Sequence, residues 1–172
     1  MNTTRKPNSF QPGIGTLALF LLIPALLLAT PIEIDLSGEW SYNASESDLG
    51  DTQFQFAWQT LIISQTSEEL SIERRGQGQG GPIEMSESIL LSGEESENAW
   101  FGDNVRVSTA SWTEEDELVI ESEAEFSAQG QTNVIRSTET FQLNDDGSVL
   151  TITNEVSSSF GEYTQTLVYE KE

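Results

Sequence analysis

The feature that most constrains this chain is a period of two in its apolar residues, which runs from residue 31 to the end. Neighbouring side chains of a β-strand point to opposite faces, so this period is typical of half-buried strands. The stretch 118–128 is the clearest case: three glutamates fall on one face, and the other face carries Leu118, Ile120, Ala124 and Phe126. No stretch after residue 30 shows the apolar stripe of a helix. We therefore predict an all-β domain.

Extended segments follow one another with short turns between them, and they are expected at 60–66, 70–75, 83–93, 104–112, 118–128, 132–143, 148–158 and 163–171. The Asp-Gly turn within 144–147 is the strongest hairpin signal. Sequential hairpins predict a roughly eight-stranded antiparallel up-and-down β-barrel, with a β-sandwich as the alternative. The glycine-rich stretch 76–82 is expected to be a flexible loop, and 45–60 a long connection with one helical turn.

The predicted inner faces of this barrel carry polar side chains among the apolar ones, and these are Ser122, Ser137, Glu139 and Asn154. A packed core disfavours such groups when they lack partners, so they favour a wet or occupied cavity. An eight-stranded barrel can hold either its own side chains or one small ligand. A register shift of one residue would exchange the inner and outer faces.

Glu139 is the only charged side chain among these four inward-facing groups. A carboxylate in a barrel interior loses its water, which raises its pKa unless a cation or a hydrogen-bond donor compensates. Arg106 and Arg136 are candidates for that role. As arginines in strands rich in Ser and Thr, however, both are also expected to be outward cross-strand partners of glutamates. The two interpretations stay open at this point.

Other candidates for ligand contact lie near strand ends. Arg74 and Arg75 either meet an anionic ligand at the barrel rim or pair with nearby carboxylates, each pair contributing little. Trp100, Phe101 and Trp112 form either an aromatic rim over a cavity or aromatic packing at the barrel ends. The predicted ligand-binding residues are Glu139, Asn154, Arg106, Trp112 and Phe126.

The first 30 residues differ from the rest of the chain. Arg5 and Lys6 precede an apolar run at 13–29, the order found in secretory signal peptides. We therefore predict a signal peptide at 1–30, a barrel domain at 31–172 and export to the periplasm or the extracellular space, with no stable membrane insertion after cleavage. The alternative is an uncleaved anchor that tethers the barrel to the membrane. Pro24 interrupts that run, and a spanning helix needs roughly 20 apolar residues.

The charge of the chain restricts its partners. None of the 29 acidic residues precedes residue 31, whereas two of the seven basic ones do, so five basic and 29 acidic residues remain, a net charge of −24. Such a surface repels phosphate backbones, and we expect no nucleic-acid partner. We also expect a monomer.

The chain contains neither Cys nor His. A disulfide framework, Ser-His-Asp and Cys-His catalysis and the usual zinc sites are therefore excluded. The acidic pairs in the predicted turns are typical of solvated carboxylates. We predict no catalytic residues, no metal site and no cofactor. If the protein were nonetheless an enzyme, such as an isomerase or a hydrolase, Glu139 would be the candidate carboxylate.

The stretch LSGEWSYNASESDLG, residues 36–50, resembles the opening of small exported bacterial lipocalin-like β-barrel proteins, most of them uncharacterised. The resemblance continues in order through LIISQTSEELSIERR, LLSGEESEN, STASW, ELVIE, FQLNDDGSVLTI and LVYEK. It implies a fold better than a function. In lipocalins the Trp of the opening Gly-x-Trp packs at the closed end of the barrel under a basic residue of the last strand. Gly38 and Trp40 match that pair, which implies a structural plug, and Lys171 is the basic residue near the C-terminus.

Three functional hypotheses follow from these patterns. The first is an exported barrel that binds a small apolar or amphipathic molecule. The second is a filled barrel that serves as a structural or protein-interaction module of the cell envelope. The third, an enzyme using a buried carboxylate, has the least support. An internal cavity of roughly 300 Å³ or more would separate the first hypothesis from the second.

Overall fold

The computed structural model describes residues 1, 34–51, 56–78, 80–128 and 131–172. The predicted signal peptide, apart from Met1, lies outside these described residues. Within the described part of the chain, no helix is long and apolar enough to cross a membrane. The described residues form strands, turns and irregular connections, and contain no helix. The prediction of an all-β domain is therefore confirmed.

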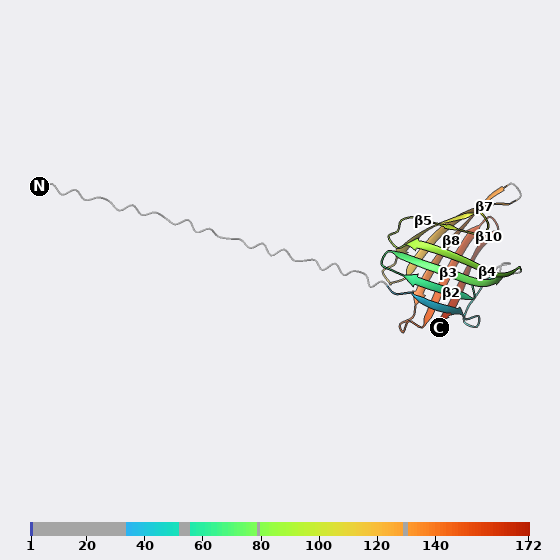
Figure 1. Ribbon diagram of the computed structural model, residues 1–172, viewed down its shortest axis with the longest axis horizontal. Helices are drawn as coiled ribbons and strands as arrows, with labels where there is room; N and C mark the ends of the chain where they lie inside the picture. Colours follow the sequence, from blue (N-terminus) through green and yellow to red (C-terminus); the bar gives the residue numbers. More distant parts are fainter. Residues whose placement is uncertain (2–33, 52–55, 79, 129–130) are drawn as a thin grey trace. The chain divides into compact units, whose positions relative to one another are not determined.

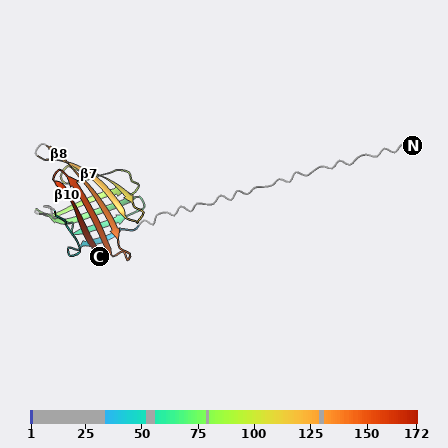
Figure 2. The ribbon, with the colours of Figure 1, turned by 180° about the vertical axis from the view of Figure 1, so that it is seen from behind.

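Ten strands make up the sheet: β1 (Gly38–Tyr42), β2 (Thr60–Gln65), β3 (Glu69–Gly78), β4 (Gly81–Leu90), β5 (Ser96–Ala99), β6 (Val105–Trp112), β7 (Leu118–Ala128), β8 (Gln131–Leu143), β9 (Val149–Ser158) and β10 (Gly161–Lys171). Each strand pairs antiparallel with its chain neighbours, except that β4 and β5 form the two edges of the sheet, and β1 also pairs with β10, which gives the order β4-β3-β2-β1-β10-β9-β8-β7-β6-β5. Figure 1 shows β2, β3 and β4 across one side of the barrel, and Figure 2 shows β7, β8 and β10 across the other.

The predicted count of eight strands is too low, and the two additional strands are the shortest ones, β1 and β5. The sequence of β5, SENA, contains no large apolar residue, so the period of two cannot reveal it. The glycine-rich stretch 76–82 is not a loop either. The β3 strand continues to Gly78 and β4 begins at Gly81, so the two form a long hairpin. The described part of 45–60 contains turns but not the expected helical turn, and residues 52–55 lie outside the description.

Side chains close the barrel between its two edge strands, β4 and β5. The Asn98 side chain of β5 donates from Nδ2 to the Ser88 carbonyl at 3.0 Å and accepts from the Ser88 amide at 2.8 Å. The Ser96 hydroxyl accepts from the Leu90 amide at 2.8 Å. Asn98 thus takes the place of a strand backbone, because its amide presents the same donor and acceptor. We call this junction the side-chain seam.

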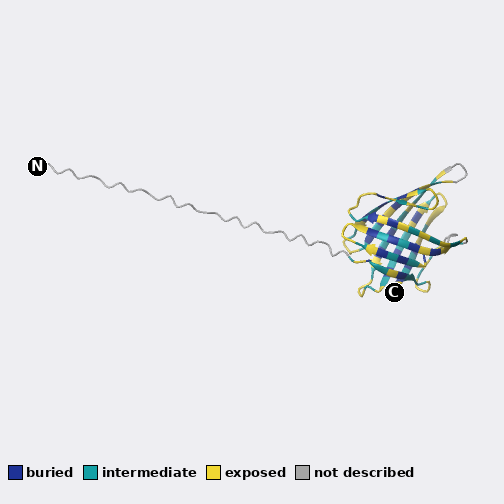
Figure 3. Ribbon diagram, in the orientation of Figure 1, coloured by how far each residue is buried: buried dark blue, intermediate teal, exposed yellow. Residues whose placement is uncertain are grey.

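The core occupies the half of the barrel that contains the β2–β3, β6–β7 and β8–β9 turns, which we call the closed end. Burial alternates along the strands, as Figure 3 shows. The fully buried side chains include Trp40, Leu61, Leu70, Leu118, Ile120, Phe141, Leu150, Ile152 and Tyr169. Most of them belong to the apolar faces that the sequence predicts for β7, β8 and β9.

Trp40 lies in this core with no exposed surface. Its Nε1 donates to the Leu36 carbonyl at 3.0 Å, and Lys171 Nζ lies 5.1 Å from the ring centroid. Gly38 makes room for Lys171, since a Cβ at that position would lie 2.7 Å from Lys171 Cε. Gly38 and Trp40 therefore stand where the lipocalin resemblance places them, at the closed end with the basic residue of the last strand beside the ring.

Candidate functional site

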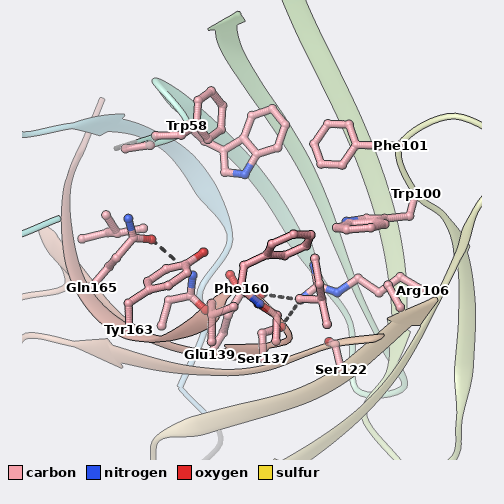
Figure 4. A pocket seen from close by; sticks show the side chains of 18 of the residues that line it. Trp58, Trp100, Phe101, Arg106, Ser122, Ser137, Glu139, Phe160, Tyr163 and Gln165 are labelled. Carbon is pink, nitrogen blue, oxygen red and sulfur yellow. Dashed lines mark hydrogen bonds and ion pairs between the residues drawn. The ribbon is translucent and has the colours of Figure 1, made fainter. Parts of the chain in front are cut away.

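The other half of the barrel is hollow. A cavity of about 810 Å³ lies there, and its walls come from the inner faces of β3, β4 and β6–β10 together with Asp51, residues 56–58 and residues 100–101. Figure 4 shows Trp58, Trp100 and Phe101 on one side of this cavity and Glu139, Ser137 and Tyr163 on the other. The barrel is thus filled at its closed end and hollow at the opposite one, which we call the open end.

Four charged side chains, which we call the ionic quartet, lie at the inner side of this cavity: Arg74 of β3, Glu87 of β4, Arg106 of β6 and Glu139 of β8. Arg74 donates to both oxygens of Glu139, from Nη1 at 3.0 Å and from Nη2 at 2.9 Å, and its Nε donates to Glu87 at 3.0 Å. Arg106 donates to Glu87 at 2.8 Å and to Glu139 at 3.0 Å. Every carboxylate oxygen of the quartet accepts at least one charged hydrogen bond.

Strand periodicity explains why these four side chains point inward. Arg74 follows Leu70 and Ile72 at intervals of two, and both of those side chains are buried. Glu87 is likewise two residues before the buried Ile89. Antiparallel pairing then brings positions as far apart as 74 and 139 to the same height in the barrel. A charged residue on an otherwise apolar strand face was the available sequence signal for Arg74 and Glu87.

The quartet determines the charge state of its members. Burial alone raises the pKa of Glu139, but the charges and hydrogen bonds of Arg74 and Arg106 outweigh this effect and hold the pKa below its ordinary value of 4.5. Burial lowers the pKa of Arg74, yet Glu139 and Glu87 together raise it above its ordinary value. Glu139 is therefore ionised and Arg74 protonated at neutral pH.

Uncharged polar groups complete the cavity wall. Asn154 donates weakly to the Gln165 side chain at 3.5 Å, and Gln165 donates to the Leu49 carbonyl at 3.4 Å. The Ser137 hydroxyl accepts from Arg106 at 3.2 Å. Burial raises the pKa of Tyr163, so its hydroxyl stays a neutral donor. These groups can orient the polar part of a molecule without taking part in chemistry.

Six aromatic rings surround the open end, and we call them the aromatic rim: Phe56, Trp58, Trp100, Phe101, Phe126 and Phe160. In the order Phe56, Trp58, Phe101, Trp100, Phe126 and Phe160, each ring contacts the next, with centroid distances from 5.0 to 6.4 Å. Phe101 is 50% exposed and Phe160 67% exposed, although both are fully apolar. Gly76 makes room beneath the rim, since a Cβ there would lie 3.2 Å from both Phe56 and Trp58.

Four of the five predicted ligand-binding residues line this cavity, and these are Glu139, Asn154, Arg106 and Phe126. Trp112 does not: it lies at the closed end, half-buried against the core, and its Nε1 has no partner among the described residues. Its place at the end of β6 beside the β6–β7 turn puts it opposite the cavity. Trp100 and Phe101 do belong to an aromatic rim.

Two of the described arginines point into the barrel and two lie on its outer surface, which differs from the expectation. Arg106 points inward, so the expectation of an outward cross-strand pair is wrong for it, whereas Arg136 is exposed and pairs with Glu123 at 2.8 Å. Arg75 pairs with Glu73 at the surface, but Arg74 is buried in the quartet. Cavity residues that the sequence reasoning missed are Phe160, Tyr163 and Gln165, whereas Arg74 was a candidate for ligand contact at the rim but lies buried in the quartet. Within the described part of the chain, no group of three or more acidic side chains is placed to hold a metal ion.

Comparisons with known proteins agree with this architecture. No family model matches the chain, and no curated protein matches its sequence. The structure of the zebrafish ileal bile acid-binding protein complexed with cholic acid matches with a TM-score of 0.54 at 13% sequence identity. The match covers 80% of this chain and 98% of that one. At this identity the likeness shows the fold alone, a lipocalin-like β-barrel, and it decides against the sandwich alternative.

Proposed function

We propose that this protein is an exported barrel that binds a small apolar or amphipathic molecule in its open half. The observation that carries the proposal is the cavity of about 810 Å³, well above the roughly 300 Å³ at which ligand pockets begin. Its wall combines apolar rings at the open end with polar groups deeper in the barrel. That arrangement suits a molecule whose apolar body lies under the aromatic rim.

The two rival hypotheses have weaker support. A filled barrel would continue its core into the open half, whereas here the core stops at the ionic quartet. An enzyme would need a carboxylate that can exchange a proton, but both oxygens of Glu139 accept from guanidinium groups and its pKa is low. Binding of a bile acid by the matched zebrafish protein adds support for a ligand in a barrel of this fold.

A fluorescence titration with a solvatochromic, uncharged apolar dye tests the proposal. Trp58 and Trp100 line the cavity, so a bound molecule should change their emission. The decisive variant is Ala124→Phe, because Ala124 is buried in β7 and lines the cavity. Glu125→Phe is its matched control, since the next residue of the same strand faces outward. Dye binding that survives Ala124→Phe as fully as Glu125→Phe would reject the cavity as the site.

Native mass spectrometry identifies the molecule itself. Protein purified from its own host is expected to carry a retained small molecule, seen as a mass excess that disappears in the Ala124→Phe variant. The export part of the proposal is tested separately by fusing residues 1–35 to a reporter. The reporter should cross the membrane, and its retention in the cytoplasm would contradict the predicted signal peptide.

A further inference from the structure

The basic side chains of the cavity are already neutralised by the protein. Arg74 and Arg106 are the two basic residues among its described lining residues, and each contacts both glutamates of the ionic quartet. An anionic ligand that approached either guanidinium would compete with two carboxylates that are fixed in place at 2.8 to 3.0 Å. The cavity therefore offers no unpaired positive charge on its described wall.

Acidic groups outnumber basic ones around the cavity. Asp51 lines it at the open end, in addition to Glu139, and Glu87 completes the quartet. Two positive charges thus face three negative ones. Residues 52–55, 79 and 129–130, which lie outside the description, contain no charged side chain. The surrounding chain is also strongly acidic, so the potential at the open end is negative.

The aromatic rim adds attraction for the same sign of charge. The face of an aromatic ring is electron-rich and attracts cations, with indole the strongest of the natural rings. Two of the six rim rings are indoles, Trp58 and Trp100, and both line the cavity. Phe101 stacks parallel to Trp58 and contacts Trp100 at 5.2 Å, which places electron-rich surface at the mouth.

We propose that the ligand of this barrel is a cationic amphipath, with its apolar body in the cavity and its ammonium or similar group between the aromatic rim and the carboxylate of Asp51. This inference rests on the proposed function, because it assigns the ligand class of the same cavity. Two features discriminate between charges. The quartet pairs the arginines and so removes the attraction for anions, and the mouth attracts cations.

Three probes with one dodecyl chain test this assignment: dodecyltrimethylammonium, dodecanol and dodecanoate, each used below its micelle concentration to displace the uncharged dye. The ammonium is expected to bind at least about tenfold more tightly than the carboxylate, and the alcohol with an affinity between the two. Added salt should reduce these differences in affinity. Dodecanoate binding as tightly as the ammonium would overturn the inference while leaving a ligand-binding barrel. Failure of all three to displace the dye would overturn both.

Two matched variants locate the discrimination. Asp51→Asn removes a carboxylate from the mouth, whereas Glu121→Gln removes one from the outer face of β7. Both change the net charge equally and both sites are exposed, so folding should not be affected. The preference for the ammonium over dodecanoate should fall several-fold in Asp51→Asn and stay unchanged in Glu121→Gln. An equal fall in both would assign the preference to the overall charge and overturn the proposed site.

Discussion

The guanidinium of Arg74 holds both carboxylate oxygens of Glu139 across the barrel interior, with Nη1 3.0 Å from Oε1 and Nη2 2.9 Å from Oε2. The two residues are 65 positions apart in the chain and both are almost fully buried, Arg74 at 3% and Glu139 at 5% exposure. A bidentate pair of this kind is strong and directional. It ties β3 to β8 at the level where the filled half of the barrel meets the hollow half.

Removing the charge of Glu139 should destabilise the barrel. Glu139→Gln keeps the shape but leaves the quartet with an unbalanced, buried positive charge, which typically costs about 3–5 kcal/mol. A poorly compensated carboxylate would have given the opposite sign, a gain in stability, so urea melts distinguish the two cases. Glu121→Gln, on the outer face, should change the free energy of unfolding by less than about 0.5 kcal/mol. Equal effects at both positions would contradict the buried quartet.

The contribution of Glu139 should also depend on pH. Its pKa is lower in the folded barrel than its ordinary value of 4.5, so the folded state binds this proton less readily than the unfolded state does. The stabilisation is therefore fully present above about pH 4.5 and is lost as the pH falls through the lower, folded value. The gap in free energy of unfolding between the parent and Glu139→Gln should shrink as urea melts are moved from pH 7 towards pH 3. A gap that widens in acid would show that the pKa is raised.

The sequence predicted the fold well where strands are long and half-buried. The inner faces of β7, β8 and β9 follow directly from their period of two, and Glu139 and Asn154 lie inside as expected. The short β5 was missed because its four residues include no large apolar side chain. The glycines of 76–82 suggested a loop, but residues 76–78 of β3 pair with residues 81–83 of β4.

The partners of Glu139 were harder to predict than its position. A single strand shows which way its side chains point, but only the register between distant strands shows which of them meet. Arg106 is one of the candidate partners, whereas Arg74 is expected at the rim, either against an anionic ligand or paired with nearby carboxylates. The apolar face formed by Leu70 and Ile72 predicts an inward Arg74 equally well. The prediction puts Trp112 at the wrong end of the barrel, because nearness to a turn does not show at which end of the barrel that turn lies.

The side-chain seam should open locally when Asn98 is changed. Asn98→Ala removes both hydrogen bonds to the Ser88 backbone, and because this edge is exposed, water replaces them at a cost of about 0.5–1.5 kcal/mol for each bond. Amide hydrogen exchange should therefore accelerate at Ser88 before the barrel unfolds globally. Glu97→Ala, the preceding and exposed residue of β5, is the control. If Ser88 exchanges at the same rate in both variants, the seam does not hold the barrel closed.

The contact between Lys171 and Trp40 should stabilise the closed end by a small and measurable amount. Lys171→Met keeps most of the apolar stem over the indole but removes the charge 5.1 Å from its centroid, so the loss should be about 0.5–1 kcal/mol. Trp40→Phe removes the Nε1 donor to the Leu36 carbonyl as well as part of the packing, and it should cost more than Lys171→Met. The two changes together should cost less than their sum, because the cation has no indole to contact once Trp40 is gone. Urea melts of the parent, the two single variants and the double variant measure this coupling, and strict additivity would show that the charge does not act through the ring.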